Sequence, residues 1–480
     1  MASRTTLTAK NLESLGAPRL AELLIDIASG DAALKRRLRL ELASENPAEL
    51  PKEIRKRLAS IARARSYVDW SKVRALAADL EVQREAIVGK VGKADPSEAL
   101  DLLWTFMALA EPVHGRCDDS NGSVSAVFYQ ACADIGRFAA ASRPDPIALA
   151  DRVHEALVAN HYGQFDHLIE VVAPALGDAG LNHLKRRMLA LAAEPVAKPA
   201  AKDRVKIGWS ISGPIYADEI EESSRRNTTR MALMRIAEAQ GDVDAFIGQY
   251  DAKTRRVPRI AADIAHRLLE AGRPDEALAT LDSAERVKHR DGIWSDFVWE
   301  DARIAVLEAL GRGEEAQKMR WNCFERSLSA VHLRDYLRRL PDFEDFEAEQ
   351  RALDHAGRFP SRLSALWFLV EWPSLDRAAK LVTAHVGDMD GNHYEILTPA
   401  AEALSAKYPL AATLLLRAMI DFTLVNARSS RYGHAARHLK ECSSLASSIG
   451  DHGTFETHDA YVARLKQSHG RKHGFWSLLA

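Results

Sequence analysis

Apolar positions along this chain recur with the period of an α-helix. Four of them between Leu20 and Ile27 are spaced i, i+3, i+4 and i+7, which places them on one face of a helix, and Gly30 then ends that helix. Further helices are predicted to begin at 95–98 and 145–146, because each segment pairs an aspartate that can cap a helix with a proline that fits its first turn. Since strand-like alternation is nearly absent from residues 1–195, the sequence predicts an all-α protein.

A change of composition divides the chain near residue 200. Residues 194–203 hold two prolines and mixed charges without an apolar stripe, which is typical of a linker. Residues 205–211 then alternate apolar with polar or small side chains, which predicts one short strand, ended by Gly213-Pro214. We therefore expect an N-terminal helical domain over residues 1–193, a linker over 194–204 and a second domain over 205–480.

The second domain is predicted to be repetitive. Gly272–Ala277 (GRPDEA) returns 39 residues later as Gly311–Ala316 (GRGEEA), each time after an apolar helix and before another, with weaker echoes at Gly241 and Gly357. The glycine can end the first helix, the acidic residue favours the start of the next, and the alanine allows close helix packing. A unit of this length, built as a helical hairpin, is typical of an α-solenoid, so we expect a tetratricopeptide-like array.

Composition and cysteine spacing suit the cytoplasm. Of the 480 residues 47% are hydrophobic and 28% charged, with a net charge of −2, which is ordinary for a globular protein and gives no strong overall field. The four cysteines form no regular pattern, as expected where thiols stay reduced. The N-terminus lacks the apolar core of a signal peptide, and the longest apolar run, near 102–110, is about half of the roughly 20 residues that a membrane span needs.

Both ends of the chain resemble a known family. Residues 7–16 and 30–42, together with 431–439 and 469–476, are similar to the two ends of a bacterial family of unknown function. They are also similar to the helical region that accompanies some SWIM zinc-finger proteins. The SWIM motif itself, Cys-x-Cys followed by Cys-x-His, is absent. The resemblance therefore implies a helical fold and no zinc site of that kind.

One helical face offers metal ligands. His434, His438 and Cys442 lie at i, i+4 and i+8 of a predicted helix, a spacing with which a helix can hold zinc. A fourth ligand would have to come from one of three later histidines: His452, His458 or His469. The alternative is ordinary packing of a helix in the repeat array. Because only the spacing supports a metal, we expect no metal and no cofactor.

Motifs of known enzymes are incomplete in this sequence. There is no GxxxxGK[ST] phosphate loop, and the zinc-protease pattern HExxH that begins at His154 fails at Val158. The oxygen-rich loop 117–122 lacks the carboxylates that an EF-hand needs, so it is predicted to be a turn. A hydrolase would need a cluster of carboxylates and histidines, for which His114 and the Asp118-Asp119 pair are isolated candidates. We therefore expect no enzyme and assign no catalytic or cofactor-binding residues.

Positive charge is concentrated near the N-terminus. Residues 1–75 contain 15 lysines and arginines against 9 aspartates and glutamates. Two basic patches stand out: Lys35, Arg36, Arg37 and Arg39 in the first, and Arg55, Lys56 and Arg57 with Arg63 and Arg65 in the second. These cations could contact the phosphates of a nucleic acid, or they could form the solvated backs of amphipathic helices paired with nearby acids.

Two functions follow from these features. The main hypothesis is a non-catalytic scaffold that binds a partner protein or peptide on a helical-repeat surface. The alternative is a nucleic-acid-associated protein that uses the two basic patches. The alternative requires those patches to merge on the folded surface.

Overall fold

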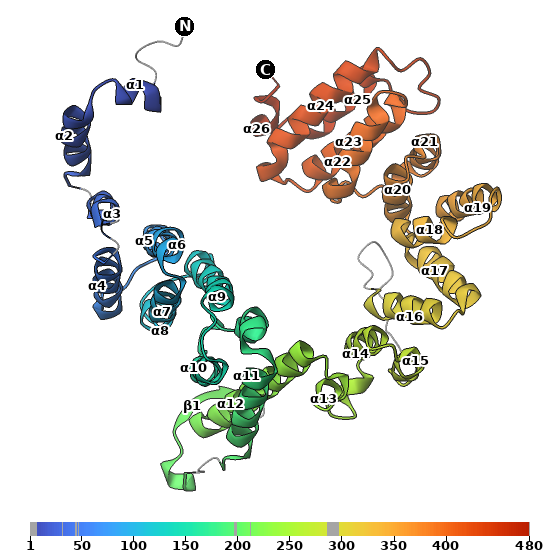
Figure 1. Ribbon diagram of the computed structural model, residues 1–480. Coiled ribbons are helices and arrows are strands. Elements are labelled where there is room, and N and C mark those ends of the chain that lie inside the picture. The colour runs from blue at the N-terminus through green and yellow to red at the C-terminus, as the bar shows by residue number, and fades with distance from the viewer. Residues whose placement is uncertain are drawn as a thin grey trace. The chain divides into compact units, whose positions relative to one another are not determined.

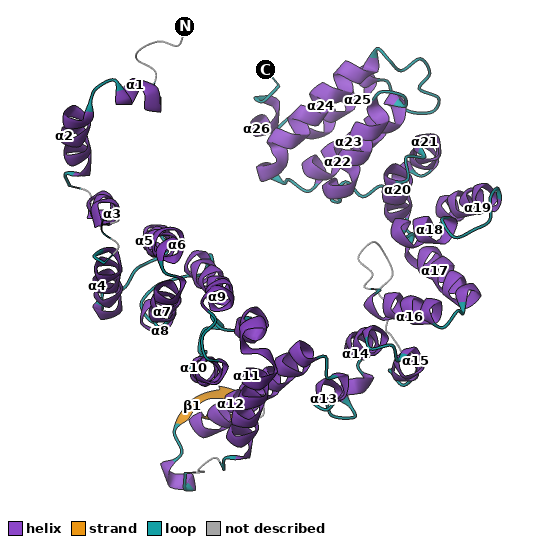
Figure 2. Ribbon diagram, in the orientation of Figure 1, coloured by secondary structure: helices purple, strands orange, loops and turns teal. Residues whose placement is uncertain are grey.

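The computed structural model describes residues 7–30, 32–43, 46, 48–195, 199–211, 213–285 and 297–479. Helices make up nearly all regular structure in these ranges, and the two strands within them form one small hairpin (Figures 1 and 2). The chain is therefore all-α, as its periodicity predicts. No described helix is both long and apolar enough to cross a bilayer.

The chain folds as two compact units, Met1–Tyr250 and Asp251–Ala480. This division lies C-terminal to the predicted linker 194–204. The reason is that the long helix after the linker packs against the long helix before it, and its residues Ala232 and Ile236 join the buried cluster of the N-terminal helices. Hydrophobic packing across the linker thus extends the first unit beyond the boundary that composition suggests.

The first unit contains thirteen α-helices, two short helices of other types and the two strands among its described residues. They are α1 (Ala9–Glu13), α2 (Ala17–Ala28), α3 (Ala32–Ala43), α4 (Leu50–Arg63), α5 (Val73–Ala86), the π-helix η1 (Ile87–Val91), α6 (Gly92–Ala94), α7 (Pro96–Met107), α8 (Ala110–His114), α9 (Ser123–Ser142), α10 (Pro146–Val158), α11 (Leu168–Ala193), the 3-10 helix η2 (Ala201–Asp203), β1 (Lys206–Ser210), β2 (Gly213–Tyr216), α12 (Ala217–Gln240) and α13 (Val243–Ile247).

The second unit contains helices and no strand among its described residues. They are the 3-10 helix η3 (Thr254–Arg256), α14 (Pro258–Glu270), α15 (Pro274–Asp282), α16 (Val298–Ala309), α17 (Gly313–Ser327), α18 (Ala330–Leu337), α19 (Glu344–Arg358), α20 (Arg362–Glu371), α21 (Leu375–Ala384), η4 (Val386–Asp388), α22 (Tyr394–Ser405), α23 (Pro409–Val425), η5 (Ser429–Arg431), α24 (Tyr432–Ala446), α25 (His458–His469) and α26 (His473–Trp476).

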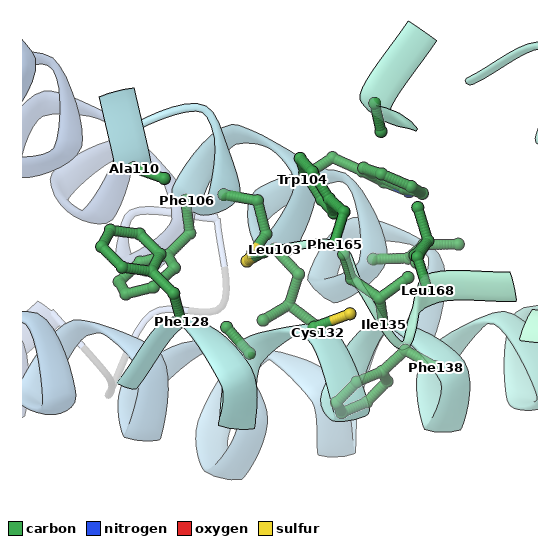
Figure 3. Close-up of a cluster of buried hydrophobic side chains, with 14 of the residues drawn as sticks. Leu103, Trp104, Phe106, Ala110, Phe128, Cys132, Ile135, Phe138, Phe165 and Leu168 are labelled. Carbon is green, nitrogen blue, oxygen red and sulfur yellow. The ribbon is translucent and has the colours of Figure 1, made fainter. Parts of the chain in front are cut away.

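The core of the first unit lies where α7 and α9 pack together. Figure 3 shows Leu103, Trp104 and Phe106 of α7 facing α9, from which Phe128 and Ile135 project toward them. The rings of Phe106 and Phe128 lie 5.5 Å apart between centroids. Side chains of this size, fully removed from water, provide most of the favourable free energy of such a core.

The predicted helix starts and stops are confirmed. The Asp95 carboxylate accepts hydrogen bonds from the backbone N–H groups of Ser97 and Glu98, at 2.9 and 3.1 Å, and so caps α7. Asp145 caps α10 in the same way. Gly30 follows α2 with a positive φ of 95°, as a residue that ends a helix often does. The apolar face of α2 is only partly covered, however, because Ile27 is 64% exposed.

The predicted strand is one half of a hairpin. β1 covers residues 206–210 and pairs antiparallel with β2, so Gly213-Pro214 begins a second strand instead of ending the extended segment. Gly213 has a φ of 125°, which other residues rarely adopt. The sequence did not reveal β2, because its Pro214-Ile215-Tyr216 segment is too short to show alternation.

The two copies of the predicted repeat adopt the same turn. Gly272 between α14 and α15, and Gly311 between α16 and α17, have φ values of 72° and 73°. In each turn the arginine that follows the glycine donates two hydrogen bonds to a glutamate three residues later, Arg273 to Glu276 and Arg312 to Glu315.

The two weaker copies of the repeat motif, at Gly241 and Gly357, adopt different backbone structures. Gly241 also has a positive φ, of 66°, and ends α12. Gly357 lies inside α19, so the echo at that position is not a turn. The main contacts within the second unit join each helix to the next one or the next but one along the chain.

Candidate functional site

One cleft of the second unit lies between α22, α23 and α24. Its volume is about 600 Å³, and side chains from these helices and from η5 line it. The three helices run side by side near the C-terminus (Figure 1). Clefts of 300 to 1,000 Å³ are typical of binding sites in proteins.

Two backbone features shape this cleft. Gly391 lies against α23 so closely that a Cβ atom there would approach the carbonyl oxygen of Ala418 to 2.0 Å, so only glycine fits. Pro399, also in the lining, lies inside α22 and has no N–H to donate to the carbonyl of Glu395, four residues earlier.

Two histidines of α24 face the cleft in different environments. His438 is 7% exposed, and its Nδ1 lies 3.3 Å from Oε2 of Glu441. Burial, partly offset by Glu441, lowers the pKa of His438, so the ring is neutral at pH 7. His434 is exposed, and its Nδ1 accepts a hydrogen bond of 2.6 Å from the Arg437 guanidinium, which can only donate.

Charges of both signs line the cleft. Arg431 donates to Asn392 and lies over the ring of Tyr394, at 5.0 Å from its centroid. A hydrogen bond from its own backbone N–H, with a smaller contribution from His393, lowers the pKa of Glu395, so this carboxyl is ionised. The two arginines of the lining, Arg431 and Arg437, are thus balanced by two glutamates, Glu395 and Glu441.

The third metal candidate lies on another face of α24. Cys442 is fully buried, its Sγ is 3.9 Å from the carbonyl oxygen of Thr413 in α23, and burial raises the pKa of its thiol to about 12. It does not line the cleft that His434 and His438 share. Across the described residues there is no group of three or more His, Cys, Asp and Glu side chains placed to hold a metal ion. Eight residues along a helix rotate the face by nearly a quarter turn, which carries Cys442 into the helix interface.

A second hollow of about 560 Å³ lies beside a different set of α23 side chains. Its lining includes Arg417, which is 6% exposed, donates from Nη1 to the carbonyl of Glu456 and lies 4.4 Å above the Tyr461 ring. Nε and Nη2 of Arg417 have no hydrogen-bond partner within the described structure. The Tyr461 hydroxyl donates to Asp421, which leaves that carboxylate engaged elsewhere.

The two basic patches meet in the first unit. Arg36 and Arg39 of α3, and Lys56 and Arg57 of α4, line one hollow of about 220 Å³. Arg55 instead pairs with Glu98 of α7. The remaining members of the first patch, Lys35 and Arg37, are exposed on α3 and do not line it.

The loop 117–122 forms a turn, as predicted. Both oxygens of Asp119 accept hydrogen bonds from the first turn of α9, through the backbone N–H groups of Val124 and Ser125. His114 stacks on Tyr162 at 4.8 Å, and its burial lowers the pKa of the ring. These groups cap a helix and fill a core, and they do not line any of the three hollows described above.

A family model matches residues 2–478, nearly the whole chain. The chain belongs to DUF6880, a family of unknown function. No curated protein and no solved structure gives a significant match. The resemblance seen at both ends of the sequence is therefore confirmed for the family of unknown function, whereas nothing in these comparisons addresses the SWIM-associated proteins.

The cleft of this DUF6880 protein was only partly predictable. The i, i+4 spacing drew attention to His434 and His438, but nothing marked Glu395, Tyr394 or Arg431 as their neighbours. Pro399 within an apolar helix was a usable signal, because proline in a helix interior removes one hydrogen bond of the helix and is costly. In the first unit, Gln83 of α5 also lines the hollow between the basic patches. It was missed in the same way, since a single glutamine in a helix carries no pattern.

Proposed function

We propose that this DUF6880 protein is a non-catalytic scaffold, and that an extended peptide segment of a partner protein binds in the cleft between α22, α23 and α24. The observation that carries the proposal is the balanced lining of this cleft, with arginine donors and glutamate acceptors around an open volume of about 600 Å³. A peptide backbone presents alternating N–H donors and C=O acceptors, which such a lining can satisfy.

Apolar and aromatic side chains in the cleft favour a peptide over a small ion. Tyr394 is 54% exposed at the start of α22, and Met419 contributes a flexible apolar wall from α23. Exposed tyrosines are frequent anchors of protein interfaces, and methionine adapts to different partner side chains. Because the wall charges cancel, the cleft offers little attraction to a ligand that carries only net charge.

The remainder of the second unit supports the same role. The turns that join α14 to α15 and α16 to α17 contain the same hydrogen bonds from an arginine to a glutamate. The main contacts are between helices close in sequence. A tetratricopeptide-like array of this kind presents surface for partners without needing a catalytic centre. The four cysteines are free thiols, which suits a reducing compartment such as the cytoplasm.

The histidines of the cleft have polar neighbours that suit binding. Within the described residues, no serine, threonine or cysteine is hydrogen-bonded to the imidazoles of His434 or His438 through a side chain. An activated nucleophile needs a base within hydrogen-bonding reach. The cleft therefore offers polar contacts for binding and no assembled nucleophile–base pair.

The nucleic-acid alternative has weaker support from the same structure. Arg36 and Arg57 pair with Asp79, and Lys56 lies 3.5 Å from Glu53. Pairing with acids reduces the field that an extended phosphate backbone would meet, and the cations gather around one hollow instead of along a stripe.

The test compares two charge-reversal variants in affinity purifications from the native host, each with and without nuclease. The double variant Arg431→Glu/Arg437→Glu changes the cleft. Arg338→Glu/Lys380→Glu is the matched control, at two exposed positions, one directly after α18 and one on α21. We expect a nuclease-resistant partner that the control retains and the cleft variant loses, followed by the same difference in Kd with the purified partner. Equal retention by both variants would overturn the cleft as the binding site, and loss of every partner on nuclease treatment would favour the nucleic-acid alternative.

A further inference from the structure

The hollow between α3, α4 and α5 gathers cations from two separate stretches of sequence. α3 contributes Arg36 and Arg39, and α4 contributes Lys56 and Arg57. The rest of the lining is Leu40, Glu53, Ser60 and Gln83. Four cations within one small hollow repel one another unless counter-charges are present. The acids that the structure places beside them are few.

The local charge does not balance. Asp79 of α5 is the shared partner of both Arg36 and Arg57, and its side chain is only 11% exposed. Lys56 has Glu53 as its partner, and Arg39 has no ionic partner among the described residues. Two carboxylates thus face four cations, which leaves an excess of about two positive charges in this hollow.

Buried hydrogen-bond donors without partners also lie beside this hollow. Gln83 of α5 lines the hollow and is fully buried, and neither atom of its amide has a hydrogen-bond partner in the described structure. Nε of Arg57 is also buried and lacks a hydrogen-bond partner there, whereas the buried Nε of Arg36 has only its 3.5 Å ion pair with Asp79. Buried polar groups in folded proteins are nearly always hydrogen-bonded, so the two unused donors beside this hollow, Nε2 of Gln83 and Nε of Arg57, indicate a ligand with acceptor atoms.

We propose that this hollow binds the phosphate group of a small molecule. A phosphate monoester carries a charge of about −1.5 to −2 at neutral pH and several strong acceptor oxygens, which matches both the charge excess and the unused donors. Arginines give forked contacts to its oxygens and Lys56 adds a point charge. The volume of about 220 Å³ admits one phosphate with a small substituent rather than a length of polyanion. The site is independent of the peptide cleft and does not rest on it.

The test measures binding of inorganic phosphate and of adenosine monophosphate to the full chain by isothermal titration calorimetry. Gln83→Leu removes the buried donor with little change of volume, and because that amide has no partner the variant is expected to fold. Arg39→Gln removes the cation without an ionic partner. Arg74→Gln, an exposed cation on α5 outside the hollow, is the matched control.

We expect the wild type and Arg74→Gln to bind with the same Kd. The Kd of Gln83→Leu and of Arg39→Gln should be higher by about tenfold or more. Tighter binding of adenosine monophosphate than of inorganic phosphate would assign a phosphate monoester, and the reverse would assign free phosphate. Absence of binding, or binding that both hollow variants retain, overturns the proposal. A second outcome also overturns the proposal: an oligonucleotide without a terminal phosphate binds with a steep salt dependence, and neither phosphate nor adenosine monophosphate competes with it.

Discussion

Nδ1 of His438 lies 3.3 Å from Oε2 of Glu441, one turn further along α24 and at the wall of the cleft. Although the carboxylate favours the protonated ring, burial dominates and lowers the pKa of His438. A neutral imidazole can donate from one nitrogen and accept at the other, so it can serve either partner group of a peptide bond.

Acid should destabilise the protein partly through His438. Because its pKa is lowered in the folded state, the unfolded chain takes up the proton at higher pH, and the free energy of unfolding falls as the pH drops through about 6.5. His438→Leu should reduce this fall in urea unfolding curves recorded above and below that pH. An identical pH dependence in the variant and the wild type would contradict the effect of burial on this ring.

The close approach of Gly391 to α23 should be sensitive to a single methyl group. Gly391→Ala should lower the free energy of unfolding by about 1–3 kcal/mol, because the added Cβ overlaps the backbone of Ala418. Gly387→Ala, four residues earlier and with open space around the new Cβ, should change it by less than about 0.5 kcal/mol. Chemical denaturation of the two variants checks this, and equal values would contradict the packing described.

Two glycines of one turn should respond to alanine with opposite signs. Gly311 has a φ of 73°, so Gly311→Ala should cost about 1–2 kcal/mol of stability. Gly313 is the first residue of α17 and has open space around it, so Gly313→Ala should stabilise by about 0.4–1 kcal/mol. Thermal unfolding should therefore give melting temperatures on either side of the wild type, and a shift in one common direction would argue against this turn.

Arg417 should matter for its volume more than for its charge. Arg417→Met keeps an aliphatic chain against Tyr461 and removes a buried charge with two unused N–H groups, so stability should change by less than about 1 kcal/mol. Arg417→Ala opens a cavity and should cost about 2–5 kcal/mol. Equal losses in both variants would mean that the charge itself holds the loop at Glu456.

Local features of this chain were predictable, and tertiary ones were not. The caps at Asp95 and Asp145 and the turns at Gly272 and Gly311 depend on residues within one or two helical turns, so their sequence determines them. The packing of α12 on α11, which brings residues after the linker into the first compact unit, depends on contacts that composition does not show.

The candidate sites follow the same rule. Helical spacing placed His434 and His438 on one face, yet it could not show that Cys442 turns into the interface with α23. The two basic patches were visible as separate charge clusters. Their meeting at Gln83, contributed by a third helix, depends on packing between α3, α4 and α5.

Packing between helices close in sequence gives the second unit a low contact order. Forming any one helix pair closes only a short loop, so folding can begin at several places and spread to either side. If the last helices of the second unit unfold, the helices near its start lose few contacts. Amide exchange should therefore be slowest in α22 and α23, which lie deep in the largest buried cluster of the unit, and fastest toward its ends.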